Sequence, residues 1–185
     1  MHLPFKHFRF VAVLAFAIIV QPVVWVGLAP SGTLDAQAQE MRQKKEKPKG
    51  RRSQVLSKRA YGIIEDAQNR LAEEDYAGAL SQLRQIRDGI KFSAYEKAVA
   101  VQTEGFVYAG QEDYARTIQA FEKAANSGNL PARVVSDLIY NLAQLNLAEG
   151  RSARALEYIT RWFATVDGEP TADAYGLKAQ IHLIM

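Results

Sequence analysis

The sequence predicts an all-α fold, in which three helical hairpins and one terminal helix follow an N-terminal export signal and a basic linker. Three observations support this fold class. Small and large apolar residues alternate with helical spacing. The pattern recurs at one interval of 38 residues. Glycine, proline and acidic residues interrupt it where turns are needed. The sequence therefore favours a repetitive helical domain over a single irregular bundle.

The repeat is visible in three columns of residues. A small residue recurs in each first helix, at Ala67, Gly105 and Ala143. Each second helix carries a small or short residue followed four positions later by a large apolar one, in the pairs Ala79/Leu83, Thr117/Phe121 and Ala155/Ile159. Residues i and i+4 share one helix face, so the small residue allows close approach and the large one fills the groove. We expect hairpins at about 60–93, 98–129 and 136–166.

A fourth segment, residues 171–185, follows the break made by Gly168 and Pro170. It reads as the first helix of another repeat, with Ala179 in the small-residue position. The predicted repeat domain therefore covers residues 60–185.

This pattern resembles the tetratricopeptide repeat, which places a small residue and an aromatic in its first helix and alanine and phenylalanine in its second. The central copy matches best, through Gly105, Tyr108, Phe121 and Ala124. Its interval is longer than the usual period of about 34 residues. The resemblance implies a helical solenoid whose first helices line a concave face.

The N-terminus has the features of a secretory signal. Lys6 and Arg9 precede an apolar run from Phe10 to Val20, and Ala36 and Ala38 provide a small-x-small cleavage pattern. We expect residues 1–38 to be a signal peptide, cleaved after Ala38, and the rest of the chain to be periplasmic. The alternative is an uncleaved inner-membrane anchor, because the stretch 10–29 is long enough to span about 30 Å of hydrocarbon.

Residues 39–59 are predicted to be a disordered basic linker. Between Arg42 and Arg59 there are nine Lys or Arg residues and one acid, Glu46. Such a segment buries little and repels itself. It is either a solvated leader or a contact for an acidic partner or an anionic membrane surface. Nucleic acid is disfavoured as a partner, because no aromatic residues interleave the charges.

Enzymatic function is not predicted. The chain contains no cysteine, and His182 is the one histidine expected to remain after cleavage. No nucleophile, phosphate-loop or zinc-protease motif occurs. The acid pairs Glu73/Glu74 and Glu112/Asp113 are interpreted as turn and cap residues. We therefore expect no cofactor, metal or catalytic residue.

The helix phase predicts a partner-binding column on the concave face. The residue after each small position, which is Gln68, Phe106, Gln144 or Gln180, should point inward. A second row, one helical turn earlier, is expected to contain Ile64, Gln102 and Tyr140. Amide side chains suit an extended peptide because each both donates and accepts hydrogen bonds, and aromatic residues supply anchors. The alternative is ordinary surface and packing. The candidate residues are Gln68, Gln102, Phe106, Tyr140, Gln144 and Gln180.

A longer series of motifs resembles one family, the periplasmic repeat protein associated with the TonB–ExbB–ExbD system of Gram-negative bacteria. The matching segments, in order, are Tyr95-Glu96-Lys97-Ala98, Phe106 to Ala109, Asn129-Leu130-Pro131, Tyr140 to Leu145 and Arg161-Trp162-Phe163. The resemblance implies an accessory of TonB-dependent uptake of iron chelates and similar nutrients across the outer membrane. The alternative function is a general cell-envelope assembly adaptor that uses the basic linker.

Overall fold

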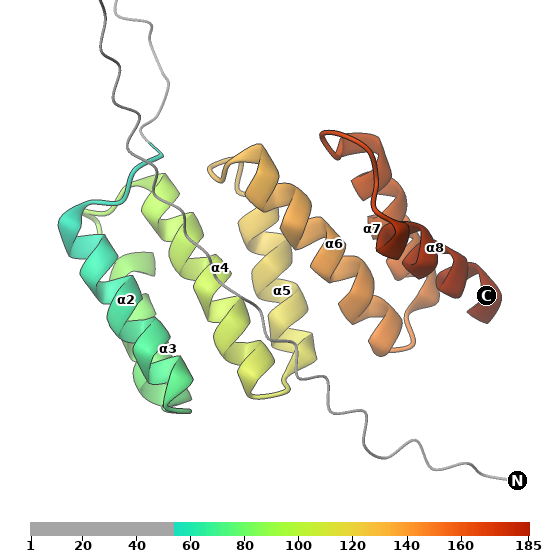
Figure 1. Cartoon of the computed structure of the whole chain (residues 1–185). Helices are drawn as coiled ribbons and strands as arrows, with labels where there is room; N and C mark the ends of the chain where they lie inside the picture. Colours follow the sequence, from blue (N-terminus) through green and yellow to red (C-terminus); the bar gives the residue numbers. More distant parts are fainter. Residues whose placement is uncertain (1–53) are drawn as a thin grey trace, which may run out of the picture. The chain divides into compact units, whose positions relative to one another are not determined.

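The computed structural model describes residues 54–185, and this part of the chain contains seven α-helices and no strand (Figure 1). The helices are α2 (Lys58–Ala72), α3 (Tyr76–Arg87), α4 (Ala94–Gly110), α5 (Tyr114–Ala125), α6 (Ala132–Ala148), α7 (Ser152–Thr165) and α8 (Ala172–Ile184). The all-helical prediction is confirmed for these residues. The predicted signal peptide and residues 39–53 of the predicted linker lie outside the described residues.

Six helices form three hairpins, α2/α3, α4/α5 and α6/α7, each joined by a turn of three residues. The second helices begin at Tyr76, Tyr114 and Ser152, which are 38 positions apart, as the sequence predicts.

The first helices begin earlier than predicted. Helix α4 starts at Ala94 and α6 at Ala132, and the last two residues of the predicted linker form the first turn of α2. For α2 and α4 the reason is capping: the hydroxyls of Ser57 and Ser93 each accept a hydrogen bond at 3.2 Å from the backbone N–H three residues later. These caps set the helix starts, whereas the apolar pattern begins about one turn later. Helix α6 follows Pro131 and has no side-chain cap.

The three hairpin turns share one backbone geometry. The middle residue of each turn is left-handed, with φ of 61° at Glu74, 59° at Glu112 and 72° at Gly150. The next residue then donates its N–H to a carbonyl five positions back, at 2.8 Å, 3.0 Å and 2.8 Å in the three turns. Bonds of this kind satisfy the last carbonyls of a helix. The repeat in the sequence is therefore a repeat in backbone conformation.

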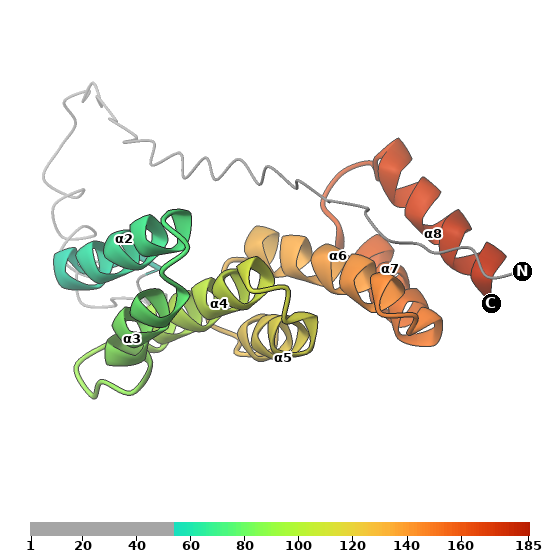
Figure 2. The ribbon, with the colours of Figure 1, turned by 90° about the horizontal axis from the view of Figure 1, so that it is seen from below.

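The hairpins pack in chain order. Helices α2, α4 and α6 lie side by side, and α3, α5 and α7 form a second layer behind them (Figures 1 and 2). Three buried clusters hold these layers together, the first from α2, α3 and α4, the second from α4, α5 and α6, and the third from α6, α7 and α8. Helices α4 and α6 each contribute to two clusters, which explains their apolar residues on more than one face.

Three of the four predicted small-residue positions are buried between packed helices. Ala67 and Ala143 are fully buried, and Gly105 faces the ring of Phe121. Ala179, in the same position of α8, is exposed. In the other hairpins this position is covered by the second helix, and within the described residues α8 is not followed by one.

Opposite effects are expected from the same substitution at two helical glycines. A Cβ at Gly105 would overlap the Phe121 ring and lie 3.4 Å from the Ala120 Cβ, whereas a Cβ at Gly62 has no atom within 4 Å. Gly105→Ala should therefore lower the free energy of unfolding by about 1–3 kcal/mol. Gly62→Ala should raise it by about 0.5–1 kcal/mol, because alanine is the better helix former.

Chemical denaturation of both variants measures these changes. If Gly105→Ala were as stabilising as Gly62→Ala, the close approach of α4 and α5 at this point would be contradicted.

Candidate partner-binding site

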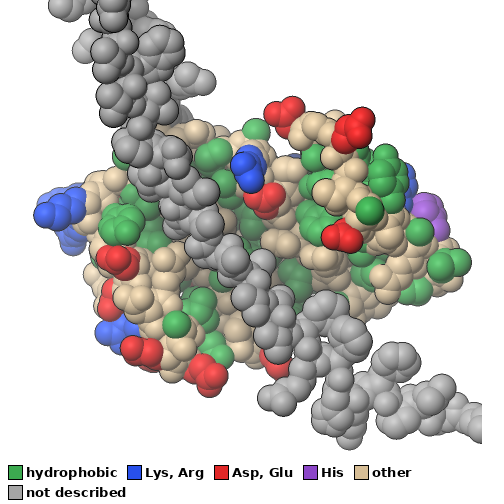
Figure 3. Space-filling view, viewed as in Figure 1, with side chains coloured by type: hydrophobic (Ala, Val, Ile, Leu, Met, Phe, Trp, Pro, Cys, Tyr) green, Lys and Arg blue, Asp and Glu red, His purple; other side chains and the backbone are tan. Residues whose placement is uncertain are grey.

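The six residues predicted to bind a partner all lie on first helices. Gln68 is on α2, Gln102 and Phe106 are on α4, Tyr140 and Gln144 are on α6, and Gln180 is on α8. Gln144 and Gln180 are exposed, and the other four are half-buried. Where the side of the molecule formed by α2, α4 and α6 is visible in Figure 3, hydrophobic and uncharged groups lie between scattered charged groups.

The two aromatic candidates are held by packing. Phe106 meets Phe121 edge-on with ring centroids 5.0 Å apart, and it packs against the second cluster. Tyr140 lies 5.3 Å from Trp162. Burial, with a smaller contribution from Asp173, raises the pKa of Tyr140, so its hydroxyl remains a donor at neutral pH. Both rings thus stabilise hairpin packing, and each leaves part of its surface accessible.

Ile64 does not line a surface. It was expected one turn before the glutamine column, but its side chain is only 4% exposed and belongs to the first cluster. A large aliphatic residue on a face that meets α3 and α4 is more stable in the core than in a groove. The candidate surface is therefore set mainly by the glutamines.

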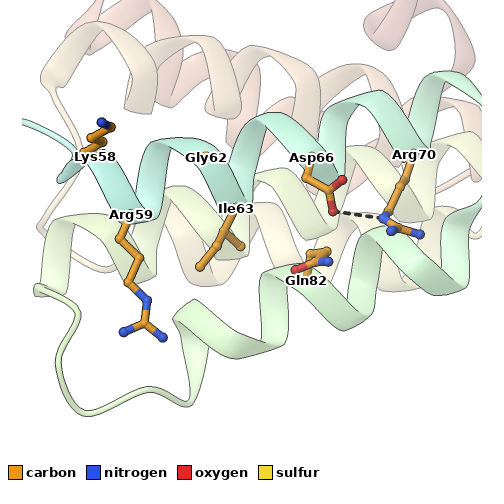
Figure 4. A pocket seen from close by; sticks show the side chains of 7 residues that line it. All are labelled: Lys58, Arg59, Gly62, Ile63, Asp66, Arg70 and Gln82. Carbon is orange, nitrogen blue, oxygen red and sulfur yellow. Dashed lines mark hydrogen bonds and ion pairs between the residues drawn. The ribbon is translucent and has the colours of Figure 1, made fainter.

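The structure also contains a pocket that the sequence did not indicate. A shallow hollow of about 680 Å³ lies beside α2 and is lined by Lys58, Arg59, Gly62, Ile63, Asp66, Arg70 and Gln82 (Figure 4). Arg70 pairs with Asp66 at 2.9 Å and with Asp75 at 2.8 Å, so part of its charge is balanced locally.

The position of this pocket follows from the repeat. The residues 38 positions after Gly62, Ile63 and Asp66 are Ala100, Val101 and Glu104, all buried in the middle of the array. The residues 76 positions later are Leu138, Ile139 and Leu142, also buried. The first hairpin thus exposes a face that is covered in later hairpins. Gly62 and Asp66 replace the large apolar residues of the last hairpin there, so the exposed face is less apolar. A comparison of the residues at these 38-residue intervals could have revealed the exposed face from the sequence.

Titratable groups inside the array serve the fold. Glu104 of α4 is buried, and its carboxylate forms an ion pair at 2.8 Å with the guanidinium of Arg87 of α3. Glu122 of α5 accepts a hydrogen bond from the Tyr158 hydroxyl of α7, and burial together with this bond raises the pKa of Tyr158 to about 12. His182 is exposed on α8. The first pair joins α3 to α4, and the second joins α5 to α7.

No protein-family model matches the chain, and no curated protein matches it. Among residues 54–185, no group of three or more histidine or acidic side chains could hold a metal ion. None of the helices in the same range is long and apolar enough to cross a membrane.

Proposed function

We propose that this protein is a non-enzymatic, tetratricopeptide-like solenoid that binds another protein along its first helices. The observation that carries the proposal is the three-fold repetition of one hairpin, with the same turn geometry at Glu74, Glu112 and Gly150. Repeats of this kind present a continuous row of equivalent positions, which suits an extended partner. No cofactor is needed for this function.

The proposed cellular role is a periplasmic accessory of a TonB–ExbB–ExbD system, in uptake of iron chelates or related nutrients. Two features of the sequence support it. The N-terminal segment has the pattern of an export signal, and the motifs from Tyr95 to Phe163 follow the order seen in that family.

The glutamine side chains would make the main contacts of the binding surface. Gln144 and Gln180 are exposed, and Gln68 and Gln102 are half-exposed, so all four can reach a peptide backbone without moving core residues. Phe106 and Tyr140 would add apolar contact only through their accessible parts. Substituting both aromatics would disturb Phe121 and Trp162, so the amides make the sharper test.

Site-specific photo-crosslinking tests this proposal. A photoreactive amino acid at Gln144 of the full chain, in cells that contain TonB, ExbB and ExbD, should crosslink to a component of that system. The matched control is Gln119, an exposed glutamine on the second helix α5. With the photoreactive group kept at position 144, Gln102→Ala/Gln180→Ala should abolish the crosslink, whereas Gln85→Ala/Gln119→Ala should leave it intact.

The outcomes separate the parts of the proposal. Equal crosslinking at Gln119 and Gln144 would contradict binding along the first helices. Crosslinking at Gln144 alone, to a protein outside the TonB system, would retain the binding surface and contradict the cellular role.

A further inference from the structure

The two edges of the array differ in charge. The three hairpin turns lie at one edge, and the links 88–93 and 126–131 lie at the other (Figure 1). The edge with the turns is mainly acidic, through Glu73, Glu74, Asp75, Glu112, Asp113 and Glu149. Over the first two hairpins the edge with the links is mainly basic, through Lys58, Arg59, Arg84, Arg87, Lys91 and Lys123. The charged groups of these two hairpins are therefore separated along the helix axes.

Two contacts hold the start of α2 against the segment that links α3 to α4. The guanidinium of Arg59 lies over the ring of Phe92, 5.5 Å from the ring centroid. The backbone N–H of Ser57 donates a hydrogen bond to the Glu96 carboxylate at 2.9 Å. Figure 4 shows the Arg59 side chain reaching toward this link. The residues next to these contacts therefore share one surface.

This surface exposes large apolar side chains among cations. Ile90, in the link, is 93% exposed, and Val55, just before α2, is 72% exposed. Lys58, Arg59 and Lys91 are exposed as well, and none of the three forms an ion pair with another residue that the structure describes. We call these five residues the basic patch.

The fold does not account for these side chains. Lys58 is in the first turn of α2, where a cation meets the positive end of the helix dipole. Ile90 contributes almost no buried apolar area to the folded chain. The nearby Asp88 does not neutralise the patch, because it is paired with Arg87 at 2.9 Å. The basic patch therefore suits a partner that is negatively charged and also accepts apolar side chains.

We propose that the basic patch binds the surface of an anionic lipid membrane, with Ile90 inserted at the level of the headgroups. Anionic headgroups attract the three cations, and the boundary with the acyl chains accepts the apolar side chains. Ile90 is not among the residues that line the pocket beside α2, so it suits a flat, fluid surface better than a peptide groove. The chain also enters the array at this patch, and residues 42–52 carry seven lysines and arginines against Glu46. The patch is separate from the first-helix glutamines, so this proposal does not depend on the proposed protein-binding function.

A fluorophore that responds to an apolar environment can report on this contact, because the chain has no cysteine and can be labelled at one introduced position. Full-length Ile90→Cys carries the label in the patch, and full-length Ala72→Cys carries it at an exposed position at the other end of α2. Vesicles of phosphatidylcholine and phosphatidylglycerol should raise the fluorescence at position 90, and nitroxide-labelled lipid should quench it. High salt should remove the response. Both chains contain the same N-terminal segment, so that segment cannot cause a difference between the two positions.

Charge removal provides the second measurement. In the chain labelled at position 90, Lys58→Gln/Lys91→Gln should raise the lipid concentration for half-maximal response about tenfold or more, because two cations no longer face the headgroups. Arg151→Gln/Arg154→Gln removes the same charge from exposed positions at the acidic edge and should change this concentration by less than about twofold. Both lysines are exposed, so their variant should keep the circular dichroism and melting temperature of the parent chain.

Three results would overturn the proposal. An equal response at positions 72 and 90 would show that no particular edge meets the lipid. An equal response to vesicles of phosphatidylcholine alone would show that the cations are not the cause. A response to polyglutamate, without a response to anionic vesicles, would assign the basic patch to an acidic polypeptide instead of a membrane.

Discussion

Replacing Arg87 with methionine is expected to lower the free energy of unfolding by about 3 kcal/mol at neutral pH. The Glu104 carboxylate is 5% exposed and is paired with the Arg87 guanidinium at 2.8 Å. Burial raises the pKa of Glu104, and the positive charge of Arg87 opposes this shift. Without Arg87 the buried carboxylate loses its ion-pair partner and keeps only the weaker influence of Lys123 and Arg84, so it must stay ionised at a cost or take up a proton. The loss lies at the lower end of the range for buried pairs because the Arg87 side chain is 30% exposed.

Three comparisons identify the cause of this loss. Arg87→Met/Glu104→Gln should recover most of the stability, because it removes the buried charge. Arg84→Met, at an exposed position of the same helix, should change it by less than about 0.5 kcal/mol. The cost of Arg87→Met should also shrink from pH 7 to pH 5, because protonation of Glu104 removes the uncompensated charge. Urea denaturation at both pH values would contradict this explanation if the double variant were as unstable as Arg87→Met.

Glu96→Gln is expected to cost about 3 kcal/mol at neutral pH. One oxygen of Glu96 accepts the backbone N–H of Ser93 at 2.7 Å, and the other accepts that of Ser57 at 2.9 Å. Burial alone would raise the pKa of Glu96, but the hydrogen bonds from Ser57 and Ser93 outweigh it and lower the pKa to about 2. A glutamine has only one oxygen, so one of the two N–H groups would face an NH₂ group.

The pH dependence of this effect has a definite sign. The folded-state pKa of Glu96 lies below its usual value of 4.5, so its contribution is fully present above about pH 5 and is lost as the pH falls toward 2. The stability difference between wild type and Glu96→Gln should therefore decrease over that range. Glu65→Gln, at an exposed position of α2, should show no such trend. A difference that stays constant from pH 7 to pH 2 would exclude the proposed role of the ionised carboxylate.

Glu96 also shows how a family-like motif can have a structural cause. The segment Tyr95 to Ala98 contributes to the resemblance to the TonB-associated repeat family. In the structure Glu96 completes a capping box with Ser93 and ties α4 to the residue that precedes α2. The motif is therefore explained by folding, and the proposal of a binding role depends more on the first-helix amides.

The candidate binding residues were only partly predictable. Gln144 and Gln180 are exposed, which is compatible with the helix phase that follows from the small residues at 38- and 36-residue intervals. The phase does not reveal how far a neighbouring helix covers a side chain. Phe106 and Tyr140 are therefore more deeply packed than a free binding surface requires, and Ile64 belongs to the core.

The sequence by itself determined the helical class, the number of hairpins among the described residues and the pairs of residues that meet within each hairpin. These features depend on residues three, four or 38 positions apart, so they can be recognised from the sequence alone. Only the tertiary structure decided which faces remain open. Ala179 and Ala143 occupy equivalent positions, yet one is exposed and the other is fully buried. Burial depends on whether another helix lies over a residue, and that is a property of the whole packed array.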